Sequence, residues 1–332
     1  MASSRITLKE LASILGLSIS TISKALNDSH EISDATKKRI VKTANLYNYR
    51  PNKIALGLKS GRTNTIAVII PSVQNSFFAR ALYGIESVIS NSDYSAIVCI
   101  TKESHEKEVA NFDMLSNGVV DGFIVAVSEE TQTVKNFSHY EDAMNQGKSI
   151  VMFDRVIDSI NCTKVKTNDY TAISEATNNL IRSKRNHIIL VSAINSLNVG
   201  KQRTKGYLKA MENAGLSSVV LEANLYQIEN VLKDYAENNA FDAVIALDTD
   251  ASFAAYKVAN ELGKNIPSDI AVIGYMSERI APYLTPELTT INQHSYTMGE
   301  TAAKMLLAQL ESKQNTDQTI LIDSTLSQRI SS

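Results

Sequence analysis

The apolar and polar positions of the first fifty residues follow the period of an α-helix. Thr7 opens a capping box (TLKE) that starts one helix, and Gly16 offers the left-handed conformation that ends it. Ser18 is placed to cap a second helix after a short turn, and Ser33 is placed to cap a third. The inward faces are Leu8, Leu11, Ala12 and Leu15, then Leu17, Ile22, Ala25 and Leu26, then Ile40, Val41 and Ala44. Short helices joined by a tight glycine-containing turn predict a helix-turn-helix within residues 1–50.

From residue 65 onward, short apolar runs alternate with longer amphipathic stretches. The predicted strands are 66–70, 96–100, 123–127, 150–153, 188–191, 219–221, 243–247 and 271–273. This alternation predicts two parallel, doubly wound α/β sheets of about five or six strands each, with a ligand cleft between two lobes. The expected fold is therefore a small all-α helix-turn-helix head joined to a two-lobed α/β core.

Residues 51–62 join the predicted head to the predicted core. This segment is short and contains Gly57, so a stable isolated helix is not expected, and its apolar residues have no obvious core to join. One interpretation is a hinge helix that folds on DNA and inserts a leucine into the minor groove, and the other is a plain linker. The core spans 63–332, with an N-lobe of about 63–160 and 291–318 and a C-lobe of about 161–290 and 319–332.

Composition places the chain among ordinary globular proteins, at 332 residues with 44% hydrophobic and 20% charged. A signal-peptide pattern is absent, and no apolar run reaches the ~18 residues of a membrane span, so a cytoplasmic protein is expected. Both cysteines, Cys99 and Cys162, lie in apolar runs, and the five histidines have no metal-ligand spacing. Neither a metal nor a cofactor is expected.

Charge is distributed unevenly along the chain. Residues 1–62 contain 11 basic and 4 acidic residues, whereas the remaining 270 contain 22 basic and 31 acidic residues. A basic head on an acidic body indicates that the head binds a polyanion, although a merely solvated basic surface remains the alternative.

The outward face of the second predicted helix favours DNA over a solvated surface. It lacks acids and presents Ile19, Ser20, Thr21, Ser23, Lys24 and Asn27. Small hydroxyl residues can donate to phosphates, Ile19 can contact a thymine methyl group, and Lys24 can reach guanine acceptors.

Enzyme signatures are missing from the predicted core. The chain has no phosphate-binding GxxxxGK[ST], no GxGxxG after a strand and no GxSxG elbow. Asp248 and Asp250 could form a catalytic pair, but acids are also common at a helix N-terminus for electrostatic reasons. The chain is therefore not expected to be an enzyme.

These residues resemble the lactose-repressor/galactose-repressor family of transcription regulators over nearly the whole chain. The most specific motifs are 7–12 (TLKELA) and 18–27 (SISTISKALN), followed by YRPN at 49–52. Further matching blocks are 65–71 (TIAVIIP), 75–78 (NSFF), 120–122 (VDG), 153–155 (FDR), 203–207 (RTKGY), 266–275 (IPSDIAVIGY) and 288–291 (LTTI).

The resemblance implies a periplasmic-binding-protein-like core, a homodimer and effector-controlled repression at a palindromic operator. It places the intercalating leucine at Leu58, although Leu56 stands where the family usually has a polar residue. The implied DNA contacts are Thr7, Ser18, Ile19, Ser20, Thr21, Ser23, Lys24, Asn27, Ser33, Thr36, Asn52 and Leu58.

The resemblance also implies an effector site for a sugar or related metabolite. Its expected residues are Asn75, Phe77, Phe78, Asp154, Arg203, Asp248 and Met276. Structural roles are the alternative, with the phenylalanines in the core and Asp154 paired with Arg155. Met276 and Leu247 replace polar residues that are usual in the family, so ordinary sugar recognition is not assumed. The rival functions are an exported binding protein, an α/β enzyme with a DNA-binding head, and a regulator that senses no ligand.

Overall fold

A computed structural model of the chain describes residues 6–49 and 62–332. The chain divides into two compact units, a head that ends at Thr63 and a body that begins at Asn64. Most of the expected hinge, including Asn52 and Leu58, lies outside the described residues.

The head consists of α1 (Leu8–Leu15), α2 (Ile19–Leu26) and α3 (Asp34–Leu46). Thr7 and Glu10 form the predicted capping box, and Gly16 ends α1 with a φ of 66°. The helices enclose a small core of Leu11, Ala12, Leu15, Ile22, Ala25, Ile40 and Ala44. Val41 was expected in this core, but it is 43% exposed because it lies one residue beyond the buried face of α3. The predicted helix-turn-helix is otherwise confirmed.

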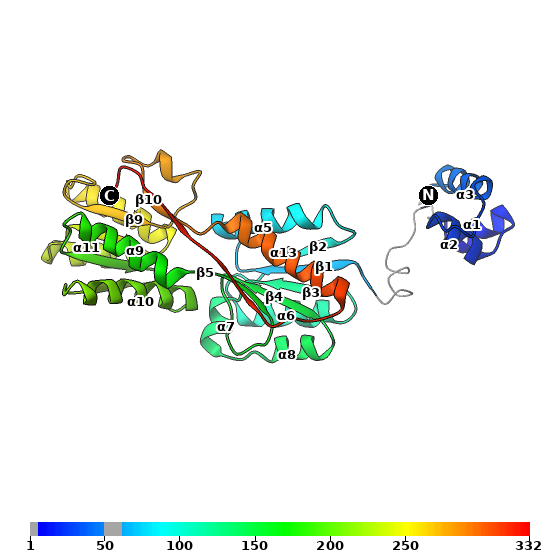
Figure 1. Ribbon diagram of the computed structural model, residues 1–332, viewed down its shortest axis with the longest axis horizontal. Helices are drawn as coiled ribbons and strands as arrows, with labels where there is room; N and C mark the ends of the chain where they lie inside the picture. The colour runs from blue at the N-terminus through cyan, green and yellow to red at the C-terminus, as the bar shows by residue number, and fades with distance from the viewer. Residues whose placement is uncertain (1–5, 50–61) are drawn as a thin grey trace. The chain divides into compact units, whose positions relative to one another are not determined.

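The N-lobe of the body is a six-stranded parallel sheet in the order β11-β5-β4-β3-β1-β2. Its strands are β1 (Thr65–Ile70), β2 (Ser95–Ile100), β3 (Gly122–Val125), β4 (Ser149–Phe153), β5 (Thr163–Thr167) and β11 (Thr319–Ile322). Its helices are α5 (Ser76–Ile89), α6 (His105–Ser116), α7 (Glu129–Val134), α8 (Ser138–Asn145) and α13 (Ser295–Ser312). Figure 1 shows α5 and α13 together on one face of this sheet, with α6 and α8 on the other.

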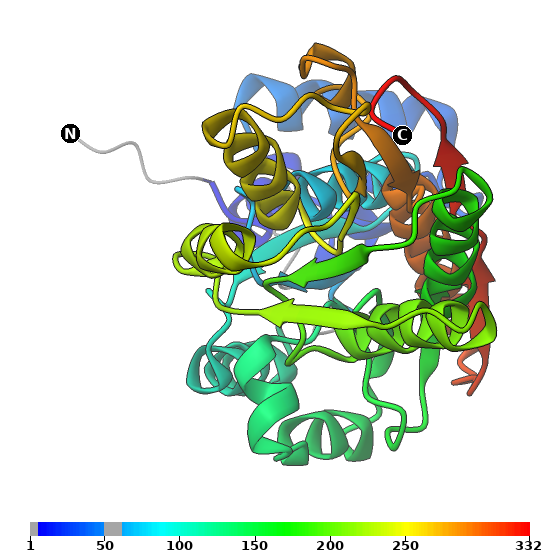
Figure 2. The same ribbon diagram turned by 90° about the vertical axis from the view of Figure 1, so that its left-hand side faces the viewer.

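The C-lobe is a second six-stranded sheet, in the order β12-β10-β9-β8-β6-β7. Its strands are β6 (Ile188–Ser192), β7 (Val219–Glu222), β8 (Ala243–Ala246), β9 (Ala271–Gly274), β10 (Thr289–Asn292) and the antiparallel edge strand β12 (Thr325–Ser327). Its helices are α9 (Asp169–Arg182), α10 (Asn198–Asn213), α11 (Ile228–Asn238) and α12 (Thr249–Glu261), with a 3₁₀ turn at Ala281–Tyr283. Figure 2 views the body from this lobe, with α11 and α12 on one side of the sheet and α9 and α10 on the other.

Each lobe has a separate core on either face of its sheet. In β1, Ile66, Val68 and Ile70 pack against α5 and α13, whereas Ala67 and Ile69 pack against α6 and α8. This alternation is the two-residue period of a strand that is covered on both faces. The doubly wound architecture expected from the sequence is therefore confirmed.

The lobe boundaries differ from those expected near residues 160, 291 and 319. Strands β5 and β11 pair with each other in the N-lobe sheet, while β10 lies in the C-lobe sheet. The chain thus passes between the lobes after β5, after β10 and after β11. Periodicity missed β5 (TKVKT) and β10 (TTIN) because both are polar in composition although mostly buried. No helix of the described part of the chain is both long and apolar enough to cross a membrane.

Candidate functional site

The exposed face of α2 carries the residues expected to contact DNA. Ser18, Ser20 and Asn27 are exposed there, Thr21 and Ser23 are half-buried, and the apolar side chain of Ile19 is 48% exposed. The Ser18 hydroxyl caps α2 by accepting from the Thr21 amide, and it lies 2.7 Å from Ser20 Oγ. An exposed isoleucine beside several hydroxyl groups suits a surface that contacts both methyl groups and phosphates.

Lys24 is engaged within the head itself. Its ammonium group forms an ion pair with Glu31, and both side chains remain about half exposed. Such exposed pairs contribute only about 0–1 kcal/mol, so the lysine can exchange its partner for a nucleic-acid acceptor at small cost.

Three further predicted contacts lie at helix N-termini. Thr7 caps α1 and Ser33 caps α3, where Ser33 Oγ also lies 2.9 Å from Thr36 Oγ1. The first turn of a helix attracts anions through its free amides and its dipole. The remaining predicted contacts, Asn52 and Leu58, lie outside the described residues.

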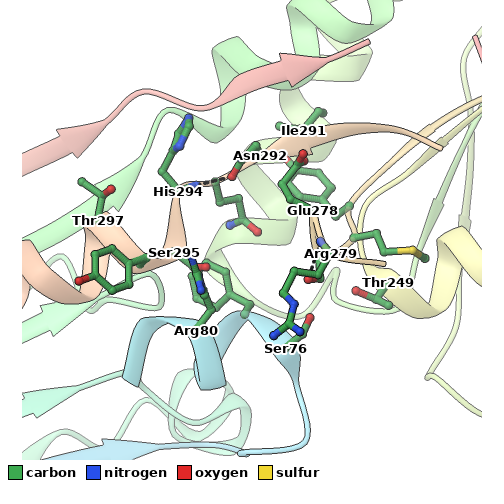
Figure 3. A pocket seen from close by; sticks show the side chains of 16 residues that line it. Ser76, Arg80, Thr249, Glu278, Arg279, Ile291, Asn292, His294, Ser295 and Thr297 are labelled. Carbon is green, nitrogen blue, oxygen red and sulfur yellow. Dashed lines mark hydrogen bonds between the residues drawn. The ribbon is translucent and has the colours of Figure 1, made fainter. Parts of the chain in front are cut away.

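A pocket of about 350 Å³ opens between the two lobes of the body. Side chains of α5 and α13 come from the N-lobe, and those of α12 and the segment after β9 come from the C-lobe, as Figure 3 shows. Phe77 and Met276, both expected from the sequence, line this pocket. A cavity of this size between two rigid lobes suits a small molecule of metabolite size.

The other five expected effector residues do not line this pocket, and three of them have structural roles beside it. Phe78 is 2% exposed and packs in the N-lobe core. Asn75 caps α5 by accepting from the Phe77 amide. Asp248 caps α12 and also accepts from the Ala193 amide at 2.7 Å, which joins α12 to the end of β6.

Asp154 and Arg203 belong to a buried polar cluster between the lobes. Arg203 Nε donates to Asp169 Oδ1 at 2.7 Å, and Nη1 donates to the Leu247 carbonyl at the same distance. The guanidinium also lies 3.8 Å from the ring centroid of Tyr275. Asp154 Oδ1 is buried without a hydrogen-bond partner among the described residues, and Asp154 has a left-handed φ of 56°. The sequence also offered Arg155 as an ion-pair partner for Asp154. In the structure the Arg155 guanidinium forms its ion pair with Glu103, at 2.7 Å.

Burial raises the pKa of the Asp154 carboxyl to about 6, despite the opposing effect of the Arg155 and Arg203 guanidinium groups. Because the folded pKa exceeds the unfolded one, the carboxyl favours folding most below pH 4 and loses that contribution as the pH rises through 6. Asp154→Asn, which tolerates the left-handed conformation, is therefore expected to stabilise the body above pH 6 by up to about 3 kcal/mol.

Urea unfolding of the wild type and the Asp154→Asn variant at several pH values between 4.5 and 8 measures this effect. The gap in the free energy of unfolding should widen in favour of the variant between about pH 4, near the ordinary pKa of an aspartate, and pH 6, and should stay nearly constant above pH 6. Asp158→Asn is the control, because the side chain of Asp158 is 83% exposed. A gap of constant size across the range would show that the Asp154 carboxyl does not titrate as its burial requires.

Two hydrogen bonds join the lobes beside this cluster. Ser196 Oγ donates to Glu129 Oε1 at 2.5 Å, and the Asn198 amide donates to Gln132 Oε1 at 2.8 Å. Both acceptors lie on α7 of the N-lobe, so a change in the angle between the lobes would break or lengthen these contacts.

Sequence reasoning missed the charged residues of the pocket. Arg80 on α5 and Arg279 after β9 both line it, together with Glu278 and His294. In the sequence these residues look like ordinary surface charges, and no spacing rule connects positions 80 and 279. Within the described residues, no group of histidine, cysteine and acidic side chains could hold a metal ion.

Comparison with protein families matches two parts of the chain. Residues 7–52 match the family described as bacterial regulatory proteins, lacI family. Residues 177–332 match the periplasmic binding protein-like domain. The first match covers the helix-turn-helix, and the second covers most of the C-lobe together with α13 and the last strands.

Individual proteins match over greater lengths. The HTH-type transcriptional regulator RegA of Clostridium saccharobutylicum is 27% identical over 333 residues, which cover 97% of this chain and 98% of that protein. A LacI family transcriptional regulator from Enterococcus faecium, solved with bound ribose, has a TM-score of 0.72 at 24% identity and covers 81% of this chain and 98% of its own. The lac repressor dimer bound to operator and the anti-inducer ONPF has a TM-score of 0.85 at 19% identity, with 99% of both chains covered. The fold of this chain is thus similar to that of the lac repressor over 99% of its length and to that of the Enterococcus regulator over 81%.

Proposed function

The chain belongs to the lacI family of bacterial regulatory proteins, and from this premise we propose that it is a cytoplasmic homodimer that represses transcription at a palindromic operator. It is a DNA-binding transcriptional regulator and not an enzyme. The observation that carries the proposal is the presence, in one chain, of a capped helix-turn-helix and a two-lobed body with a pocket between its lobes.

Helix α2 is the proposed recognition helix. Two copies of it enter successive major grooves, about one helical turn apart, when two chains pair. Hydroxyl groups at the starts of α1, α2 and α3 hold phosphates, while Ile19, Lys24 and Asn27 face the bases. Asn52 and Leu58, which lie outside the described residues, are proposed to contact the minor groove and bend the site.

A small molecule in the interlobe pocket is proposed to control this binding. Phe77 and Met276 contact it directly, and Asp154 and Arg203 respond to it from the adjoining buried cluster. The bound ribose of the Enterococcus relative supports an effector of metabolite size. A ligand that binds more tightly to one lobe angle than to another shifts the protein toward that angle. The resulting change in the free energy of operator binding is typically about 1–3 kcal/mol.

Selection of the full-length protein against a random pool of duplex DNA, followed by sequencing of the bound fraction, tests the proposal. Enrichment of a palindrome with two equal half-sites supports a dimeric repressor. Enrichment of a single asymmetric site, or of no sequence at all, with and without metabolite mixtures, would overturn it.

Lys24→Ala is expected to relax base preference at one position of each half-site, at a cost of about 1–3 kcal/mol. The selected operator and its single-base variants, measured by fluorescence anisotropy, check this. Lys42→Ala on the exposed side of α3 is the matched control, because it removes the same charge elsewhere in the head. The control should lower affinity for every sequence alike. Equal loss across all sequences for Lys24→Ala would refute base reading by this residue.

A further inference from the structure

The interlobe pocket has an excess of positive charge. Arg80 and Arg279 line it from opposite lobes, and neither forms an ion pair with an acid among the residues that the structure describes. Figure 3 shows Arg279 extending from the C-lobe toward Ser76 at the start of α5. Arg80 lies over the ring of Tyr296, at 5.3 Å from the centroid, which positions its guanidinium without neutralising it.

The acid in the lining is already paired. Glu278 Oε2 accepts from Arg329 Nη2 at 2.5 Å, and Oε1 accepts from Thr290 Oγ1 at 2.7 Å. The charge of Glu278 is therefore balanced by Arg329. The unbalanced charges that line the pocket are the guanidinium groups of Arg80 and Arg279.

Three helices also begin at the pocket. Ser76, Thr249 and Ser295 are the first residues of α5, α12 and α13, and all three line the cavity. Each places a hydroxyl group there, whereas the N-terminus of α5 is already capped by Asn75 and that of α12 by the Asp248 carboxylate. In the described chain, α13 has no side-chain cap, and its first residues, Ser295, Tyr296 and Thr297, all face this pocket. Their amides are the ones that an α-helix leaves without an internal acceptor.

A buried donor without a partner lies in the same lining. Tyr275 is 4% exposed, and its phenol oxygen has no hydrogen-bond partner among the described residues. Beside it stands Met276, which offers no acceptor for ligand hydroxyl groups comparable to a carboxylate. The lining therefore offers several donors and no unpaired carboxylate.

We infer that the effector is an anionic metabolite whose phosphate or carboxylate group is held by Arg279, Arg80 and the first turn of α13. The inference rests on the proposed function, because it names the chemical class of the effector for the same pocket. Arginine suits this role because its planar donors can hold two oxygens of one oxyanion at once. The uncharged part of the ligand packs against Phe77, Tyr275 and Met276.

Thermal shift and calorimetric titration of the full-length protein test the inference with paired probes. Ribose and glucose are the neutral probes, ribose 5-phosphate and glucose 6-phosphate form the phosphate arm, gluconate forms the carboxylate arm, and inorganic phosphate is tested alone. We expect saturable binding in at least one of the anionic arms, and the arm that binds identifies the oxyanion. The neutral partner sugar should bind at least about tenfold more weakly, because it lacks the charge-assisted hydrogen bonds.

Arg279→Gln and Arg80→Gln are the test variants, since both side chains are exposed and their loss leaves no buried acid unpaired. Each should weaken binding of the anionic probe by about tenfold or more. Arg182→Gln at the end of α9 is the control, because it removes an equally exposed arginine outside the pocket lining.

The possible failures are distinguishable. The inference is overturned, and the repressor proposal stands, if the protein selects a palindrome but binds no anionic probe. The same holds if neutral and anionic probes bind equally well to the wild type and to both variants. If no operator is selected while an anionic probe binds through Arg279, the repressor proposal fails and the oxyanion site stands.

Discussion

Arg203→Met is expected to lower the free energy of unfolding of the body by about 3–5 kcal/mol, as removal of one member of a buried ion pair usually does. Arg203 is 3% exposed, and its guanidinium holds Asp169 and the Leu247 carbonyl together across the C-lobe. Without it, the Asp169 carboxylate keeps a hydroxyl donor in Thr167 at 3.0 Å but loses its counter-charge. Asp154, which faces the same guanidinium, then adds repulsion between buried acids.

The double variant Asp169→Asn/Arg203→Met is the matched control for this prediction. It removes the unpaired charge as well as its partner, so it should recover much of the stability that the single variant loses. Urea unfolding followed by circular dichroism measures all of these proteins. A double variant that is as unstable as the single one would mean that packing, and not charge, accounts for the loss.

Gly299→Ala is expected to destabilise the N-lobe by about 3 kcal/mol or more, since the new methyl group has no space. A Cβ atom at Gly299 would lie 2.0 Å from the Ala81 carbonyl oxygen of α5. The same helix crossing is tight from the other side, where a Cβ atom at Gly84 would lie 2.1 Å from the Tyr296 carbonyl oxygen. These neighbours are backbone atoms and cannot rotate away, so α5 and α13 would have to separate. An ordinary glycine-to-alanine change inside a helix would instead stabilise it by about 1 kcal/mol.

Unfolding midpoints of Gly299→Ala, Gly84→Ala and the double variant test this contact. The double variant should lose less than the sum of the single losses, because both substitutions force the same helices apart. Glu86→Ala, on the exposed side of α5, is the control and should change stability by less than about 0.5 kcal/mol. Unchanged or increased stability in the glycine variants would show that the helices do not pack as closely as the structure describes.

Local sequence determined the head almost completely. The caps at Thr7, Ser18 and Ser33 and the glycine at position 16 set the helix ends through contacts between residues at most four positions apart. Such short-range contacts can be read from spacing alone. The one error, at Val41, arose because a helix of thirteen residues has apolar positions beside its buried face as well as on it.

Hydrophobic runs likewise determined the central strands of both lobes, because strands covered on both faces must be apolar at nearly every position. Strands β5 and β10, each one place inside the edge of its sheet, escaped this rule because they are polar in composition. The threonines and lysines of β5 are buried by pairing with β4 and β11, and strand β11 comes from more than 150 residues further along the chain. Which lobe β5, β10 and β11 join was decided by these long-range pairings.

By itself the sequence determined the class of protein, the capped helices of the head, the doubly wound body and part of the pocket lining, namely Phe77 and Met276. Only the tertiary structure decided that Phe78, Asn75 and Asp248 support the fold beside the pocket, and that Arg80 and Arg279 line it from opposite lobes. The physical reason is that secondary structure and capping depend on neighbours in the chain. A pocket's charge depends on which distant side chains the packing of two lobes brings together, and on which of them it leaves without a partner.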